Sequence, residues 1–280
     1  MKKRNTNIFM LTLLGLFMVF GVSAQNFQGM ATYQSARSMK NFQFKAEGLS
    51  PDMQKQIQEK LKKQMQKEYE LKFNLTESTW KEVESLDGGP ASAVSGGGMV
   101  MTISSGGSSL LYKNTAEMKY LEETEVFSKP FLVDDTLETR EWQLTGDTKQ
   151  IGNYQAQKAI FSRTRERQMM TFGDGEDGEM KTVTDTLEIE AWFTPQIPVS
   201  QGPDDYWGLP GLILEVTDGT TTYLCTKVVL NPEDGVEIKV PSKGKRVNRE
   251  ELKAITEEKS AEMMKKFSKG GKGTTFKIGG

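Results

Sequence analysis

The stretch TLEIEAWFT, residues Thr186–Thr194, alternates apolar and polar side chains. Its apolar members, from Leu187 to Phe193, fall on one side of an extended chain, because successive side chains of a strand point to opposite faces. The pattern predicts a strand with one face in a core and the other toward solvent, as in an antiparallel sheet.

Similar runs lie on both sides of this stretch, and short segments with Gly, Asn or Asp join many of them. We predict strands at 26–36, 70–75, 78–85, 110–113, 118–126, 131–134, 142–144, 154–163, 182–194, 212–216, 221–230 and 236–241. No helix-length segment separates successive strands from 110 to 194, so a parallel α/β sheet is not expected.

Two helices are predicted. In Pro51–Glu68, apolar side chains recur every four residues. A second helix begins at Asn248, whose spacing to Glu251 matches a capping box. The fold class is therefore α+β: one large, curved antiparallel β-sheet, with a helix in the N-terminal half and a C-terminal helix covering its concave face or one end.

The first 24 residues have the order of a secretory signal peptide. Lys2–Arg4 is basic, Ile8–Val22 is apolar, and Val22–Ala24 has the small residues of a cleavage site. We expect an exported protein, periplasmic or secreted, with no transmembrane segment after cleavage. Residues 25–267 are expected to form one domain with a flexible Gly/Ser loop at 87–109, followed by a disordered tail at 268–280.

The composition excludes several kinds of chemistry. The chain has no histidine and one cysteine, Cys225. This removes Ser-His-Asp and Cys-His catalysis, zinc sites with a His ligand, and an internal disulfide. Without the signal peptide the chain is net acidic, which argues against nucleic acid as a partner. We expect no cofactor and no metal.

Prolines concentrate after the Thr186–Thr194 strand: four of the nine lie between positions 195 and 210. Proline fixes φ and removes a backbone donor, so this segment predicts a rigid crossover between two strands. One interpretation is a structural clamp, in which Tyr206 and Trp207 seal one end of the sheet. The other is a ligand-facing lip. The motif residues are Gly202, Pro203, Gly208, Leu209, Pro210, Gly211, Leu212 and Ile213.

Residues 208–213 read GLPGLI, and 129–135 read KPFLVDD. With the run WQLT at 142–145, these motifs resemble the GLPGLI family, exported proteins of unknown function found mostly in Bacteroidetes. The run TGDTKQIGNYQAQKA at 145–159 is similar to families built on the curved sheet of periplasmic lipoprotein carriers. That similarity implies a half-barrel and carries no function by itself.

The preferred hypothesis is a non-enzymatic binding or interaction module for an apolar ligand or a cell-envelope partner. Its candidate ligand-binding residues are Tyr206, Trp207, Leu209 and Leu212.

Two alternatives remain open. One is a hydrolase without histidine, in which Asp204, Asp205 and Glu188 supply carboxylate chemistry. The other is a metal-binding exported protein that uses methionine pairs or the acidic stretch at 173–179.

Overall fold

The computed structural model describes residues 27–37, 52, 66–83, 93–96, 99–102, 109–171 and 179–270. The predicted signal peptide, most of the acidic stretch at 173–179 and the chain after 270 lie outside these residues. The predicted helix Pro51–Glu68 also lies almost wholly outside them. Its last two residues belong to a strand instead, so that end of the prediction is wrong.

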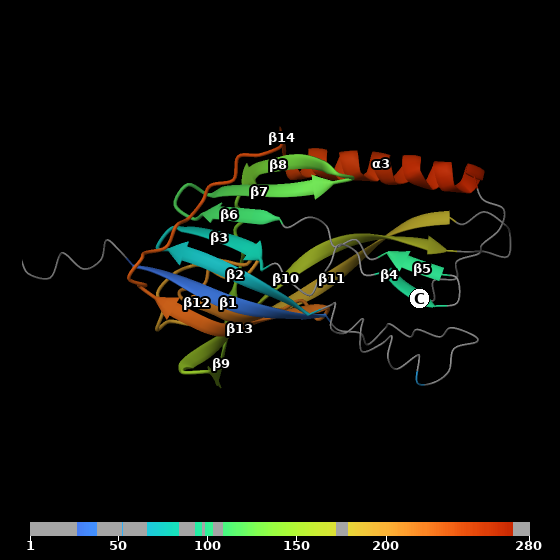
Figure 1. Cartoon of the computed structure of the whole chain (residues 1–280). Coiled ribbons are helices and arrows are strands. Elements are labelled where there is room, and N and C mark those ends of the chain that lie inside the picture. The colour runs from blue at the N-terminus through green and yellow to red at the C-terminus, as the bar shows by residue number, and fades with distance from the viewer. Residues whose placement is uncertain are drawn as a thin grey trace, which may run out of the picture.

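Twelve strands form one sheet (Figure 1). Across the sheet they are β14 (Lys245–Val247), β8 (Lys129–Thr136), β7 (Lys119–Val126), β6 (Leu110–Asn114), β3 (Glu77–Glu82), β2 (Lys67–Asn74), β1 (Gln28–Arg37), β13 (Thr221–Leu230), β12 (Leu212–Thr217), β11 (Glu179–Thr194), β10 (Tyr154–Thr171) and β9 (Gln143–Ile151). Every neighbouring pair is antiparallel except β14 with β8, which is parallel. The sheet is open, with β14 and β9 at its edges, and the large antiparallel sheet is confirmed.

The core lies mainly on one face of the central strands, which we call the inner face. Along β1, Ala31 and Tyr33 are fully buried while Gln34 between Tyr33 and Ser35 is exposed. Directly opposite Ala31 on β2 lies Leu71, which in turn lies opposite Trp80 on β3. Paired residues of an antiparallel sheet share a face, so the alternation that predicts the strands also assembles the core.

The predicted strand at 236–241 is wrong. This segment is irregular and connects β13 to β14 over the other face of the sheet. Ile238 packs there against Tyr112, Leu121 and Leu132. A segment that crosses the face of a sheet has no strand edge beside it with which its backbone could pair. After this segment, Glu123 Oε1 accepts hydrogen bonds from the N–H groups of residues 242 and 243.

Strands β10 and β11 are longer than predicted and project beyond their neighbours (Figure 1). β9 pairs with β10 only as far as Ile160, and β12 pairs with β11 only from Glu190 onward. Residues 161–171 and 179–189 therefore pair only with each other, as a two-stranded ribbon. A separate small hairpin, β4 (Ala93–Gly96) with β5 (Met99–Thr102), lies within the segment predicted as a flexible loop.

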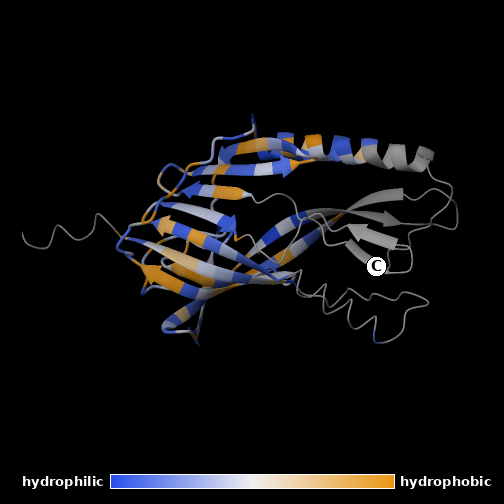
Figure 2. Cartoon of the chain, in the orientation of Figure 1, coloured by the Kyte–Doolittle hydropathy of each residue, from blue (hydrophilic) through white to orange (hydrophobic). Residues whose placement is uncertain are grey.

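The C-terminal helix, α3 (Arg249–Gly270), begins as predicted. The Asn248 side chain accepts the N–H of Glu251 at 2.8 Å, and the Glu251 side chain accepts the N–H of Asn248 at 2.9 Å, which is a reciprocal capping box. Leu252 and Ile255 pack against the core, and hydrophilic residues alternate with them along the helix (Figure 2). In the described ranges, no helix is long and apolar enough to cross a bilayer.

The β11–β12 connection depends on glycine for two different reasons. Gly208 has φ of +95°, a conformation that other residues rarely adopt. Gly211 has no such φ, but a Cβ there would lie 2.2 Å from the carbonyl oxygen of Thr194. The backbone of the connection therefore passes directly against the end of β11.

We expect Gly211→Ala to destabilise the fold by about 3–5 kcal/mol, because the methyl group meets backbone that cannot move aside. Gly146→Ala is the matched control: Gly146 has φ of +85° and open space around it, so only backbone strain of about 1–2 kcal/mol should appear. Urea unfolding of both variants measures the difference. Equal losses would contradict the close approach at Gly211.

Candidate functional site

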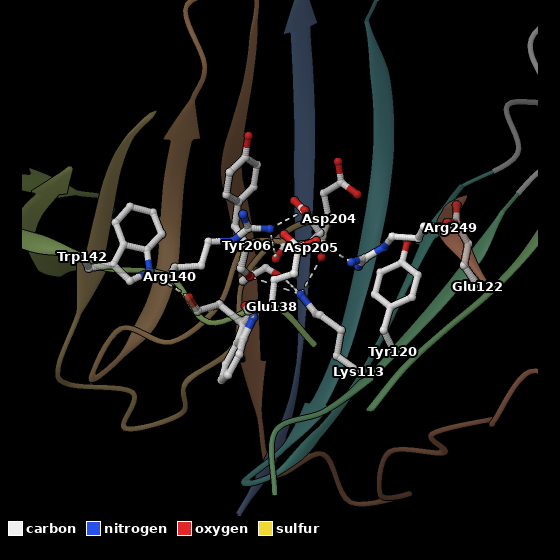
Figure 3. Close-up of polar contacts among 12 residues, drawn as sticks. Lys113, Tyr120, Glu122, Glu138, Arg140, Trp142, Asp204, Asp205, Tyr206 and Arg249 are labelled. Carbon is white, nitrogen blue, oxygen red and sulfur yellow. Dashed lines mark hydrogen bonds and ion pairs between the residues drawn. The ribbon is translucent and has the colours of Figure 1, made fainter. Parts of the chain in front are cut away.

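A buried lysine holds the connection between β11 and β12 against the sheet. Lys113 lies on β6 with its side chain fully buried. Its Nζ donates to the carbonyl oxygens of Gly202 at 2.8 Å, Asp204 at 2.5 Å and Tyr206 at 3.2 Å (Figure 3). A protonated amine has three N–H groups, so each is matched by one carbonyl of the same short segment.

Two acidic side chains and a second cation accompany this lysine (Figure 3). Arg140 forms an ion pair with the Asp205 carboxylate and also donates to the Asp205 carbonyl oxygen at 3.3 Å. Asp204 has φ of +51°, and its carboxylate accepts a hydrogen bond of 3.4 Å from the Tyr223 hydroxyl. The result is a compact cluster of two cations and two carboxylates beneath the segment.

The surroundings shift the pKa values of this cluster toward neutrality. Burial lowers the pKa of Lys113 to about 7, against the opposing effect of the Asp205 and Asp204 carboxylates. Burial has the largest effect on Asp204 and repulsion from Asp205 the second largest, and both raise its pKa, which reaches about 6. Both shifts reflect the cost of holding a charge away from water.

The structure buries most of the predicted ligand-binding residues. Tyr206 is 4% exposed, Leu209 1% and Leu212 0%, whereas Trp207 is half-buried. The other residues of the motif are divided: Gly202, Pro203, Gly211 and Ile213 are buried, and Gly208 and Pro210 are exposed. This burial favours the clamp interpretation, because three of the four side chains present no surface to a ligand.

Trp207 ties the clamp to its surroundings. Its indole N–H donates to the carbonyl oxygen of Glu138 at 3.0 Å, and its own carbonyl accepts the indole N–H of Trp142 at 2.8 Å. The Glu138 carboxylate in turn forms an ion pair with the Arg249 guanidinium of α3 at 3.0 Å. The clamp and the helix are thus joined through one residue.

Of the three acids proposed for hydrolysis, Glu188 does not converge with Asp204 and Asp205. Glu188 is exposed, and its neighbour Ile189 points to the opposite face of β11, where it belongs to the cluster that contains Tyr206. The carboxylate of Asp205 is engaged by Arg140. Among the residues that the structure describes, no three or more Cys, Asp or Glu side chains gather into a metal site.

A groove lies between α3 and the inner face of β7 and β8. It has a volume of about 380 Å³. The lining residues are Tyr120, Glu122 and Val133 from the sheet and Arg249, Leu252, Lys253, Thr256 and Glu257 from α3.

Polar contacts fix the floor of this groove (Figure 3). The Tyr120 hydroxyl donates to Glu122 Oε2 at 2.6 Å, and the Arg249 guanidinium lies 4.0 Å from the centre of the Tyr120 ring. Burial raises the pKa of Glu122, while the hydrogen bond from Tyr120 and the charge of Arg249 oppose this shift. A groove with apolar walls and a few polar groups is the usual form of a small-ligand site.

Sequence reasoning did not single out Lys113, Arg140, Tyr120, Glu122 or Arg249. A signal existed for Lys113, because strand alternation places it on the same face as Leu111. A lysine at a core-facing position needs buried acceptors. Which carbonyls supply them is visible only in three dimensions.

The comparisons with known proteins give little about function. Residues 142–215 match the model of a Bacteroidetes-type family described as "Protein of unknown function (Porph_ging)". The match includes the hexapeptide at 208–213, but the GLPGLI label is not confirmed. No curated protein matches the chain.

Two solved structures, titled "Structure of PNGF-II in C2 space group" and "Structure of PNGF-II in P21 space group", are similar to the chain at 13% identity and a TM-score of 0.45. They cover 82% of this chain. The chain spans about a third of their length.

We expect Lys113→Met to destabilise the fold by about 2–4 kcal/mol, because it leaves buried carbonyl oxygens without donors and removes one of the two cations beside the carboxylates. Lys67→Met is the matched control, since the Lys67–Glu82 pair is about one-third exposed and should be worth less than about 1 kcal/mol. Chemical denaturation at pH 7 measures both. Similar small losses would contradict the anchoring role of Lys113.

The same cluster predicts a minimum in stability between pH 6 and 7. The Lys113 pKa is about 7 when folded and 10.5 ordinarily, so the unfolded chain holds more protons above pH 7 and stability rises with pH there. The Asp204 pKa is about 6 when folded and 3.8 ordinarily, so stability falls as pH rises from 3.8 to 6.

The test is chemical denaturation of the wild type, Lys113→Met and Asp204→Asn at pH values from 3.8 to 10.5. Subtracting the Lys113→Met curve from the wild-type curve should reveal the rise in stability above pH 7. Subtracting the Asp204→Asn curve from the wild-type curve should reveal the fall in stability below pH 6. Each limb is expected to approach about 1.4 kcal/mol per pH unit. A maximum in place of the minimum would show that the charged pair stabilises the fold.

Proposed function

We propose that this chain is an exported, non-enzymatic binding protein, and that the groove between α3 and the inner face of β7 and β8 is its binding site. The observation that carries the proposal is the groove itself: a space of about 380 Å³ under a helix that packs on the sheet through one stripe. Its size lies within the range of small-ligand sites, about 300–1,000 Å³.

The composition of the groove supports an apolar or amphipathic ligand. Val133 from the sheet and Leu252 from α3 line it and offer hydrocarbon surface, with the Tyr120 ring on the sheet side. Contact with such surface contributes about 25 cal/mol per Å² removed from water. The Glu122 carboxyl and the Arg249 guanidinium add two polar groups that can orient a ligand.

The placement of the acids supports binding rather than hydrolysis. Asp204 and Asp205 lie in the charged cluster that holds the clamp, and Glu188 lies on another face. Export is proposed on the basic, apolar and small-residue order of residues 2–24 and on the GLPGLI resemblance. An envelope partner that inserts an apolar side chain in the groove would use the same contacts as a small ligand.

Leu252→Gln should weaken binding of an apolar probe about tenfold, because it removes hydrocarbon from the groove wall worth about 1–2 kcal/mol. The probe is uncharged N-phenyl-1-naphthylamine, whose fluorescence rises on transfer from water. Ala254→Gln, on the exposed side of the same helix, is the matched control and should bind as the wild type does. If both variants bind as tightly as the wild type, the groove is not the site.

A further inference from the structure

We propose that the ligand of this groove is an amphiphile with a protonated amine, whose ammonium group contacts the Glu122 carboxylate while its hydrocarbon lies against Val133 and Leu252. This inference rests on the proposed function, since it assigns the chemical class of the ligand to the same groove.

Glu122 is an acid in an apolar part of the sheet. On β7 its register partners are Val133 on one side and Leu111 on the other, and both are buried. Paired residues share a face, so the carboxylate stands on a floor of hydrocarbon. Burial of a carboxylate without an ion-pair partner is costly, which makes this position a favourable one for a cation.

The cations of the groove are committed elsewhere. The Arg249 guanidinium forms its ion pair with Glu138 at 3.0 Å and covers the Tyr120 ring. Lys253 also has an interaction of its own. Within the described ranges Glu122 has no ion pair, and its hydrogen bond comes from the neutral Tyr120 hydroxyl. The charge of Arg249 acts on Glu122 without an ion pair between them, and a ligand ammonium would supply a direct ionic contact.

The acids that act on Glu122 from beyond the groove belong to a cluster that also holds two cations, Lys113 and Arg140. The Asp205 carboxylate adds to the raised pKa of Glu122, and Asp204 is in turn affected by Glu122, so the acids act on one another across the inner face. At the groove floor, a ligand carboxylate would be repelled by the Glu122 carboxylate, whereas an ammonium would be attracted to it. An uncharged alkyl chain would gain only the hydrophobic contacts.

The experiment compares three probes of equal chain length by calorimetry on the full chain: octylamine, octanol and octanoate. We expect octylamine to bind at least tenfold more tightly than the other two. Glu122→Gln should reduce its affinity about tenfold and leave octanol unchanged. Glu250→Gln, exposed in the first turn of α3 and outside the groove, is the matched control and should change neither.

The outcomes separate this inference from the proposed function. If octanol or octanoate binds as tightly as octylamine and Leu252→Gln weakens it, the groove binds ligands but the amine assignment is overturned. If octylamine binds but Glu122→Gln has no effect, the carboxylate is not its partner and the inference also fails. If no probe is sensitive to Leu252→Gln, the proposed function itself fails.

Discussion

The β11–β12 connection is held against the sheet by a single buried amine, that of Lys113. Each proline in this segment removes one backbone donor. The N–H groups of Leu212 and Ile213 in β12 satisfy only the carbonyls of Ile197 and Gln201. Lys113 satisfies three other carbonyls of the segment at once from the inner face of β6, five positions away from β12 in the order of the sheet. One side chain thereby connects the two halves of an open sheet.

This contact also positions the rest of the site. With residues 202–206 held down, Asp205 meets Arg140, and Trp207 reaches the backbone of Glu138. Glu138 then pairs with Arg249, the first residue of α3. The helix is thus fixed to the sheet by its capped first turn and its apolar stripe, and the groove is the space that remains beside them.

Strand positions were predictable because alternation is a local property. Most predicted strands were found, and the capping box at Asn248 was found, since both depend on residues a few positions apart. The prediction of a strand at 236–241 was wrong because the apolar Ile238 packs onto the face of the sheet, and the segment does not add a strand to an edge. The segment interpreted as either a structural clamp or a ligand-facing lip is mostly buried for the same kind of reason: its apolar side chains face inward.

By itself, the sequence determined that the chain forms an antiparallel sheet with a capped C-terminal helix and that it lacks histidine and disulfide chemistry. These conclusions follow from side-chain period and composition, which need no knowledge of distant neighbours. Only the tertiary structure decided that Lys113, Asp204 and Arg140 meet and that Glu122 stands under α3. Such contacts join residues far apart in the chain, and their energies come from burial and charge, which exist only once the sheet has brought them together.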